Sequence, residues 1–471
     1  MKNSTEIRRK QTTSYEGYSQ EARLETGDNG KVHSISAALE NGRNGESACT
    51  NDLMERIISK TNMNDAYKRV MRNKGSHGID GMSVDELLPY LKENGQSLLK
   101  DILEGNYKPQ SVRRVEIPKP DGGIRLLGIP TVIDRMIQQA IAQELSLIFD
   151  WQFSEYSYGF RPGRNAHQAI KQAQEYMNEG YTWVVDIDLE KYFDTVNHDK
   201  LMALVARRVE DKRVLKLIRA YLKSGVMING VVTRTEKGCP QGGPLSPLLS
   251  NIMLDELDKE LENRNHKFCR YADDNQLYVR SKKAAERVMR SVTNFIEEKL
   301  KLKVNQRKSA IGRPWQRKFL GFSFYRRKEE IRVRIHPKSV KRIKEKIKEI
   351  TSRSKAWTMK YRYKKLKQVI TGWVSYFRLA DMKGLVRNLD SWARRRLRMC
   401  YWKRCKKVKT RFRMLKKLGI DEPKAWEYAN TRKGYWRISN SPILTRTFTN
   451  QRFKNLGYFS FTERYAQVNN S

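Results

Sequence analysis

Two adjacent aspartates between two strand-like runs constrain this chain more than any other feature. Asp273 and Asp274 follow the strand-like run 268–271 and Ala272, and they precede a second run at 276–279. This pattern predicts a β-hairpin that carries both carboxylates at its turn. Adjacent like charges are costly unless a cation neutralises them, and Mg²⁺ prefers carboxylate oxygens. Taken alone, the pair has a second interpretation, a solvated turn without a ligand.

A second strand-like run also ends in carboxylates. Residues 182–187 are mostly β-branched or aromatic, and Asp186 and Asp188 stand at their end. Two Mg²⁺ ions can clamp the attacking and leaving oxygens of an in-line displacement. One carboxylate from this strand and the pair from the hairpin would suffice to hold them. The two runs together favour a catalytic metal site over a solvated turn.

The basic charge of the chain is concentrated at its C-terminal end. The formal net charge is +42, and residues 331–471 contribute 39 Lys and Arg against 8 Asp and Glu. Residues 1–50 are polar and electrically balanced, which predicts a disordered leader. A uniform solubility effect does not explain this distribution. A polyanion-binding surface in the last third of the chain does.

Cysteine usage and hydropathy indicate the compartment. Five cysteines include no CxxC pair, which favours free thiols in a reducing environment over a disulfide or zinc framework. The N-terminus has no apolar signal segment, and no apolar run approaches the roughly 20 residues that a membrane helix requires. We expect a cytoplasmic protein from these features.

Periodicity predicts a mixed α+β fold followed by a helical region. Strands are expected at 112–117, 182–187, 230–235, 268–271, 276–279 and 319–324. Helices are expected at 64–73, 85–94, 132–148, 166–178, 199–206, 212–223, 247–263 and 283–300, then at 338–353, 361–379 and 383–407. The irregular order argues against a doubly wound sheet.

At this point the chain resembles a group II intron-encoded reverse transcriptase/maturase, most closely the bacterial type that lacks an endonuclease domain. The motifs that carry the resemblance lie in order at 70–81, 117–125, 158–162, 185–196, 238–247, 271–274, 302–308 and 319–322. The resemblance runs from about residue 53 to 465. It implies a right-hand polymerase fold of fingers and palm, an α-helical thumb/maturase domain and a small basic C-terminal module. It further implies a bacterial, nucleoid-associated protein.

The resemblance assigns the catalytic metal ligands. In the family the metal-binding aspartate lies five residues before the aromatic steric gate, which makes Phe193 the gate and Asp188 the ligand rather than Asp186. Asp186 would then support the turn. The implied Mg²⁺ ligands are the carboxylates of Asp188, Asp273 and Asp274 and the backbone carbonyl of Leu189.

The resemblance also implies a nucleotide site. Lys119 and Arg125 would contact the incoming triphosphate, because basic side chains bind phosphate oxygens; solvated surface charges are the alternative. Phe193 would exclude a 2′-hydroxyl, and Gln241 would lie along the nascent base pair. Lys308 would protonate the leaving pyrophosphate, with an ordinary helix-surface lysine as the alternative.

The basic third of the chain resembles the maturase (X) domain. Its exposed cations are expected to bind nucleic acid, namely Arg394, Arg395, Arg396, Arg398, Lys403 and Arg404. Composition sets off 1–50 as a leader without a clear family counterpart. The resemblance divides the rest into 51–330 (fingers and palm), 331–410 (thumb/maturase) and 411–471 (basic nucleic-acid-binding module). Family endonucleases need clustered His and Cys, and no histidine follows His336. We therefore expect no endonuclease, so the primer would come from elsewhere.

The implied activity is RNA-directed DNA polymerisation together with maturase assistance to splicing. Partners would be group II intron RNA, an RNA template with a DNA or RNA primer, target DNA and dNTPs, with Mg²⁺ as cofactor. The oligomeric state stays open, a dimer of the RNA-free chain being one alternative. Two other functions remain: a non-catalytic splicing factor, against which the three aspartates argue, and a domesticated reverse transcriptase in defence, against which the intact X domain argues.

Overall fold

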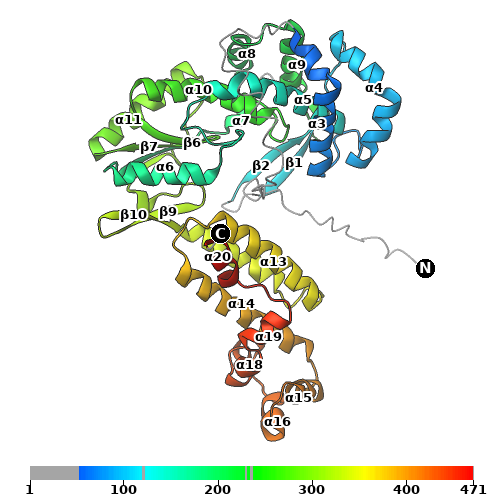
Figure 1. Cartoon of the computed structure of the whole chain (residues 1–471), viewed down its shortest axis with the longest axis vertical. Helices are drawn as coiled ribbons and strands as arrows, with labels where there is room; N and C mark the ends of the chain where they lie inside the picture. Colours follow the sequence, from blue (N-terminus) through cyan, green and yellow to red (C-terminus); the bar gives the residue numbers. More distant parts are fainter. Residues whose placement is uncertain (1–51, 119–121, 229–230, 234–236, 470–471) are drawn as a thin grey trace, which may run out of the picture. The chain divides into compact units, whose positions relative to one another are not determined.

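The computed structural model describes residues 52–118, 122–228, 231–233 and 237–469, and divides them into two compact units (Figure 1). The first runs to Arg332, and the second runs from Val333 to the last described residue. Within this described part, no helix has both the length and the apolar character needed to cross a bilayer.

The first unit is built around a four-stranded sheet in the order β6-β7-β3-β8. Its strands are β3 (Trp183–Ile187), β6 (Lys267–Tyr271), β7 (Asp274–Val279) and β8 (Ala310–Gly312). β7 pairs antiparallel with β6 and β3, and β3 pairs antiparallel with β8. Figure 1 shows α10 (Ser246–Asn263) and α11 (Lys282–Asn294) on one side of this sheet and α6 (Ala166–Asn178) on the other.

A second four-stranded sheet has the order β2-β1-β4-β5. Its strands are β1 (Val112–Pro118), β2 (Ile124–Ile129), β4 (Val226–Ile228) and β5 (Val231–Thr233). The β1–β2 hairpin is antiparallel, whereas β1 pairs parallel with β4. The short β9 (Phe322–Arg327) and β10 (Glu330–Ile335) form a separate two-stranded sheet.

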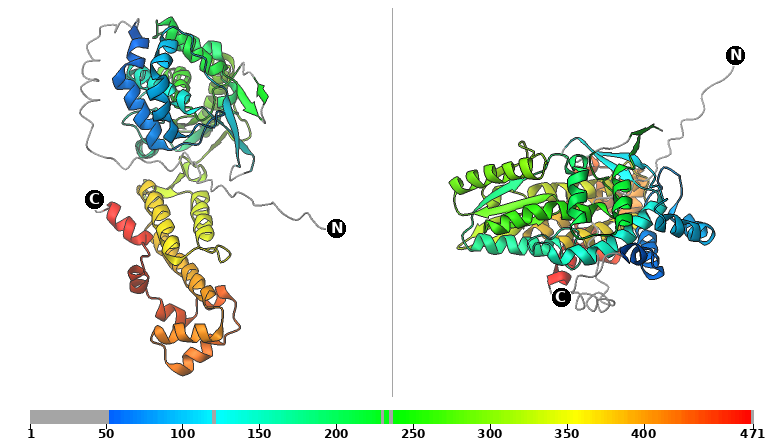
Figure 2. Two further views of the ribbon diagram at one scale, coloured as in Figure 1. Left: turned by 90° about the vertical axis from the view of Figure 1, so that its right-hand side faces the viewer. Right: turned by 90° about the horizontal axis from the view of Figure 1, so that it is seen from above.

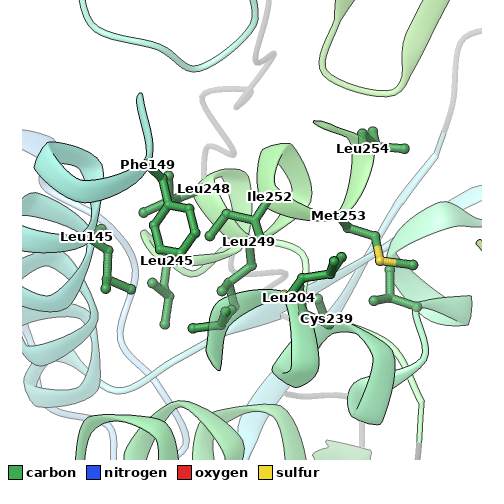
Figure 3. Packing of buried hydrophobic residues seen from close by; sticks show 14 of the residues in the cluster. Leu145, Phe149, Leu204, Cys239, Leu245, Leu248, Leu249, Ile252, Met253 and Leu254 are labelled. Atoms are coloured by element: carbon green, nitrogen blue, oxygen red, sulfur yellow. The ribbon is translucent and has the colours of Figure 1, made fainter. Parts of the chain in front are cut away.

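The remaining helices of the first unit follow apolar periodicity. They are α2 (Leu53–Ile58), α3 (Lys60–Asn73), α4 (Leu87–Leu103), α5 (Val132–Phe149), α7 (Tyr192–Thr195), α8 (His198–Ala206) and α9 (Lys212–Lys223). Helix α10 is buried on nearly all faces along residues 248–255, where it crosses the interior. Figure 3 shows its leucines packed against α5, α8 and Cys239; the labelled residues are Leu145, Phe149, Leu204, Cys239, Leu245, Leu248, Leu249, Ile252, Met253 and Leu254.

The second unit is entirely helical after β10. Its helices are α12 (Pro337–Ile350), α13 (Met359–Tyr376), α14 (Lys383–Arg404), α15 (Val408–Lys417), α16 (Glu422–Ala429), α17 (Tyr435–Ile438), α18 (Pro442–Thr447), α19 (Asn450–Asn455) and α20 (Phe461–Asn469). The red helix α20 lies against the yellow helices α13 and α14 in Figure 1 and in the left view of Figure 2.

A buried carboxylate holds the end of the chain in this unit. Asp390 of α14 is 1% exposed. It accepts hydrogen bonds from the Tyr458 hydroxyl (2.9 Å), the Phe461 amide (2.8 Å), and the amide and hydroxyl of Thr462 (2.9 and 2.6 Å). Hydrogen bonds to a charged acceptor are the stronger kind, so Asp390 fixes where α20 begins.

The α+β class and the helical C-terminal region predicted from the sequence are confirmed, with local corrections. The strand expected at 319–324 begins only at Phe322, because 319–322 forms a tight turn closed by its own backbone bonds. Of the strand expected at 230–235, residues 231–233 form β5 and the others lie outside the described residues. The short strand β8 and the small helices α15–α20 were not expected, since elements this short carry little periodicity.

We predict that Asp390→Ala loosens the end of the second unit. The amides of Phe461 and Thr462 and the hydroxyls of Tyr458 and Thr462 would lose their acceptor, which should cost about 2–4 kcal/mol of local stability. Hydrogen exchange at the Phe461 and Thr462 amides measures this cost. Asp421→Ala, an exposed carboxylate of the same unit, is the control. Equal protection of both amides in the two variants would contradict the prediction.

Candidate active site

The turn that joins β6 and β7 presents two carboxylates. Tyr271 pairs with Asp274, so Ala272 and Asp273 form a two-residue loop. Ala272 has φ +57°, a left-handed conformation that is unfavourable for a residue with a Cβ. Asp273 and Asp274 are both exposed. The hairpin expected from the sequence is therefore present, and its backbone is strained at the turn.

The register between β3 and β7 brings the other carboxylates to the same place. Asp186 lies opposite Gln276, and Ile187 lies opposite Asn275. Continuing this register by one residue places Asp188 across from Asp274. Side chains alternate between the faces of a strand, so Asp186, Asp188, Asp274 and Gln276 share one face. The structure thus brings the carboxylates of the two runs to one face of the sheet.

Burial, together with repulsion among the carboxylates on this face, raises the pKa of two of them. Although the Asp274 side chain is partly open to solvent, the protein packed around its carboxyl, together with repulsion from Asp273 and Asp186, raises its pKa to about 7. Burial raises the pKa of Asp186 to about 6, although a hydrogen bond from Gln276 opposes the shift. Lys308 Nζ lies 3.9 Å from Asp188 Oδ2. The lysine expected at the site is therefore beside it.

The donor set suits a hard divalent cation by its chemistry. It offers the three carboxylates and the backbone carbonyl of Leu189. This carbonyl receives no hydrogen bond from the described residues. The backbone bonds to residues 303–305 are made by its neighbours Asp188 and Glu190 instead. Within the described ranges, no three His, Cys, Asp or Glu side chains are gathered tightly enough to form a finished metal site. An ion would therefore have to draw the side chains together.

The loop that follows Lys237 contains Gln241 and is hydrogen-bonded to the backbone of Phe193. The Phe193 carbonyl accepts a hydrogen bond from the Cys239 amide at 2.6 Å. Gly238 has φ +97°, and a Cβ there would lie 2.9 Å from that same carbonyl oxygen. The Gln241 carbonyl accepts from the Gly128 amide of β2 at 2.8 Å. The loop therefore links the residue expected as gate to the β1–β2 hairpin.

The two cations expected at the triphosphate belong to that hairpin. Arg125 is exposed on β2, where it pairs with Ile117 of β1. Lys119 lies outside the described residues. Among the residues that the structure describes, Arg125 forms no ion pair.

A buried network that sequence reasoning missed supports the strained turn. Arg270 is 0% exposed and donates to both oxygens of Asp258, through Nε at 2.7 Å and Nη2 at 2.5 Å. Its Nη1 donates to the Ala272 carbonyl at 3.1 Å and to Asn251 Oδ1 at 2.9 Å. A strand arginine directly before the turn was the only signal of this network in the sequence.

Close backbone packing completes the support beneath the turn. Asn251 Nδ2 donates to the Gly159 carbonyl at 2.9 Å. A Cβ at Gly159 would lie 2.3 Å from the Ala272 amide nitrogen, which no side chain allows. The turn is therefore held by the hydrogen bond from Arg270 to the Ala272 carbonyl and by the close backbone contact between Gly159 and Ala272. Such over-determination is what keeps an unfavourable conformation in place.

The basic residues expected to bind nucleic acid are only partly free. Arg398 departs from the expected exposed face: it is 7% exposed, and its Nε donates to the Ser439 carbonyl at 2.8 Å. Arg395 Nη2 donates to the Trp436 carbonyl at 3.1 Å, and Arg396 Nε donates to the Thr351 hydroxyl at 2.5 Å. These three arginines hold neighbouring segments against α14. Arg394 and Lys403 are half-buried and Arg404 is exposed.

We predict that Arg270→Met lowers the free energy of unfolding by about 3–5 kcal/mol, because Asp258 stays buried without its partner. The double variant Arg270→Met/Asp258→Leu should recover much of that loss, since both charges are then gone. Urea unfolding followed by tryptophan fluorescence measures both. A double variant that loses the sum of its two single losses would refute the coupling.

Two family models match the chain, one after the other along the sequence. The reverse transcriptase (RNA-dependent DNA polymerase) family matches residues 117–324. The maturase-specific domain of group II introns matches residues 340–419. The first match contains every residue discussed for the active site, and the second contains α12 to α15.

Two curated proteins and one solved structure are similar to the chain. Protein YkfC of Escherichia coli (strain K12) is 36% identical over 287 residues, which cover 52% of this chain and 75% of YkfC. The group II intron-encoded protein LtrA of Lactococcus lactis subsp. cremoris is 37% identical over 206 residues, 44% of this chain and 34% of LtrA. The match thus spans about a third of LtrA. A solved structure of telomerase from Candida albicans covers 77% of this chain and 67% of its own, with TM-score 0.41 and 11% identity.

Reverse transcriptases use divalent metal ions, and a maturase-specific domain implies RNA binding. The order of the two domains, the carboxylates at the β6–β7 turn and the identity to YkfC agree with each other. This chain belongs to the group II intron-encoded reverse transcriptase/maturase family of RNA-directed DNA polymerases.

Proposed function

We propose that this chain extends a DNA or RNA primer with dNTPs on an RNA template in the presence of Mg²⁺, and that it also binds its own group II intron RNA and assists its splicing. Copying the spliced intron into target DNA would serve mobility. The single observation that carries the proposal is the β3–β7 register, which sets Asp188 across from Asp274. Its place of action would be the nucleoid of a bacterial cell, where intron RNA and target DNA meet.

The roles at the metal site follow from the chemistry of the donors. Asp188, Asp273, Asp274 and the Leu189 carbonyl would hold Mg²⁺, which supplies charge stabilisation for the attacking 3′-oxygen and the leaving pyrophosphate. Asp186, one pleat behind Asp188 and bonded to Gln276, would keep the end of β3 in position. The strained turn and its buried network would keep Asp273 and Asp274 facing β3.

The nucleotide would be positioned by residues around the loop after Lys237. Phe193 would lie under the sugar and exclude a 2′-hydroxyl by overlap. Gln241 would lie beside the nascent pair, and Arg125, with Lys119, would bind the triphosphate. Lys308, whose Nζ is 3.9 Å from Asp188, would donate a proton to the pyrophosphate oxygen as it leaves.

The second unit would bind RNA as thumb and maturase domain. We propose residues 51–330 as fingers and palm, 331–410 as thumb/maturase domain and 411–471 as a basic module, preceded by the leader 1–50. Of the six basic residues expected at the interface, Arg394, Lys403 and Arg404 are the ones proposed to contact phosphates. Arg395, Arg396 and Arg398 would act indirectly, because their guanidinium groups hold protein segments together.

We predict that Asp273→Ala abolishes primer extension on an RNA template, with a loss on the order of 10²–10³-fold or more. Filter binding of intron RNA and splicing assistance should change less than about twofold, because Asp273 lies in the polymerase unit. Asp65→Ala, which removes the same charge from the exposed face of α3, is the matched control. A comparable loss of splicing in Asp273→Ala would refute the separation of the two roles.

We predict that Phe193→Ala admits ribonucleotides. Removing the ring opens space beside the sugar, so kcat/KM for an rNTP should rise about 10- to 100-fold relative to the matching dNTP. Single-nucleotide extension with each substrate measures the ratio. Phe193→Tyr keeps the ring and should keep the discrimination. An unchanged ratio in Phe193→Ala would mean that another residue selects the sugar.

A further inference from the structure

A basic and aromatic cavity lies in the second unit, far along the chain from the catalytic aspartates. Its volume is about 790 Å³, and it is lined by Arg353, Thr431 and the segment 432–437. A second cavity of about 390 Å³ is lined by Ser352, Arg353, Ser354 and Lys403. Arg353 lines both, so the two cavities adjoin at its side chain.

The aromatic wall of this cavity is held in place before any ligand arrives. Tyr435 and Trp436 begin α17, which packs on α14. Arg395 donates to the Trp436 carbonyl, and Arg398 donates to the Ser439 carbonyl. The Ser439 hydroxyl also donates to the Trp436 carbonyl, at 2.7 Å. The two rings therefore project from a fixed backbone rather than from a free loop.

Cations lie beside the rings of Tyr435 and Trp436, and part of the Trp436 ring stays exposed. The Arg395 guanidinium lies 3.9 Å from the centre of the Trp436 ring, and yet Trp436 stays 39% exposed. Arg353 and Lys403 lie 5.2 and 4.9 Å from the centre of the Tyr435 ring. A cation on an aromatic face is favourable in itself. It also sets positive charge beside surface on which a base can stack.

The charge of the cavity has no internal counterion. Its cations are Arg353, Lys403, Arg432, Lys433 and Arg437, its lining contains no acidic residue, and none of these cations is within ion-pair distance of a carboxylate in the described part of the chain. Glu349, the acid nearest in sequence to Arg353, is already paired with Lys346 and Lys355. An ordinary solvated surface would interleave acids among such cations.

We propose that this cavity binds one unpaired nucleotide of a bound RNA, with its base against Trp436 and Tyr435 and its phosphate between Arg353 and Lys403. The hydroxyls of Ser352 and Ser354, 2.8 Å apart, line the phosphate end. A paired nucleotide does not fit, because its base faces are already covered by its neighbours in the helix. The inference rests on the proposed RNA binding of the maturase domain, and it names a bulged or looped-out residue as what is recognised.

The test uses the full-length chain and two RNA hairpins with the same stem sequence, one fully paired and one with a single additional bulged 2-aminopurine. The wild type should bind the bulged hairpin more tightly and quench its 2-aminopurine, because stacking on an aromatic ring quenches that base. Trp436→Ala should weaken binding of the bulged hairpin on the order of tenfold, restore the fluorescence, and leave binding of the paired hairpin within about twofold.

Matched controls separate this site from general basicity. Trp426 is also 39% exposed in the same unit, stacked on Phe412, and Trp426→Ala should leave both hairpins unaffected. Arg353→Gln/Lys403→Gln should weaken binding of the bulged hairpin and flatten its salt dependence by about one to two phosphate contacts. Lys416→Gln/Lys424→Gln, which removes two cations already paired with acids, should not.

The binding results separate three claims: the pocket, the choice of RNA, and the proposed function. Equal losses for both hairpins, or for Trp426→Ala and Trp436→Ala, would overturn the pocket while leaving the polymerase and maturase roles intact. Tighter binding of a bulged DNA hairpin would overturn the choice of RNA. A wild type that extends no primer and binds neither hairpin would instead overturn the proposed function on which the inference rests.

Discussion

The pairing register of β3 against β7 is the constraint on which the proposed site depends. Continued by one residue past Ile187, it places Asp188 opposite Asp274, with Asp186 behind them on the same face. A slip of one residue would turn the aspartates of β3 away from that face and bury them against helices. The register is protected from both sides, since β6 and β8 flank the pair and the apolar residues of the opposite face pack on α10 and α11.

The β6–β7 turn next to this paired region has a backbone conformation that is energetically unfavourable. Ala272 adopts a left-handed conformation, and the Arg270–Asp258 pair is fully buried. A buried ion pair is weak support for stability in itself. Here it does something more specific, because Arg270 also bonds to the Ala272 carbonyl. The polar interior is thus arranged to aim two carboxylates at the end of β3, and the positive charge of the chain is kept mainly in the other unit.

Periodicity and motif order predicted much of this from the sequence. Long helices such as α6 and α9 begin and end where they were expected, because their apolar spacing is regular. The hairpin at Asp273 and Asp274 was equally visible. Tertiary contacts could not be predicted. Nothing in the sequence shows that Arg270 donates to Asp258, or that Arg398 donates to the Ser439 carbonyl. A run of arginines looks the same whether its side chains meet phosphate or protein, so burial decides their roles.

The most direct test of the central claim is primer extension on an RNA template with dNTPs and Mg²⁺, comparing Asp188→Asn with Asp186→Asn. Both changes remove one charge from the same face of β3 and keep the shape of the side chain. If Asp188 holds the metal and Asp186 only supports the strand, extension disappears in the first variant and persists in the second. Extension that survives Asp188→Asn, or that is lost only in Asp186→Asn, would contradict the assignment.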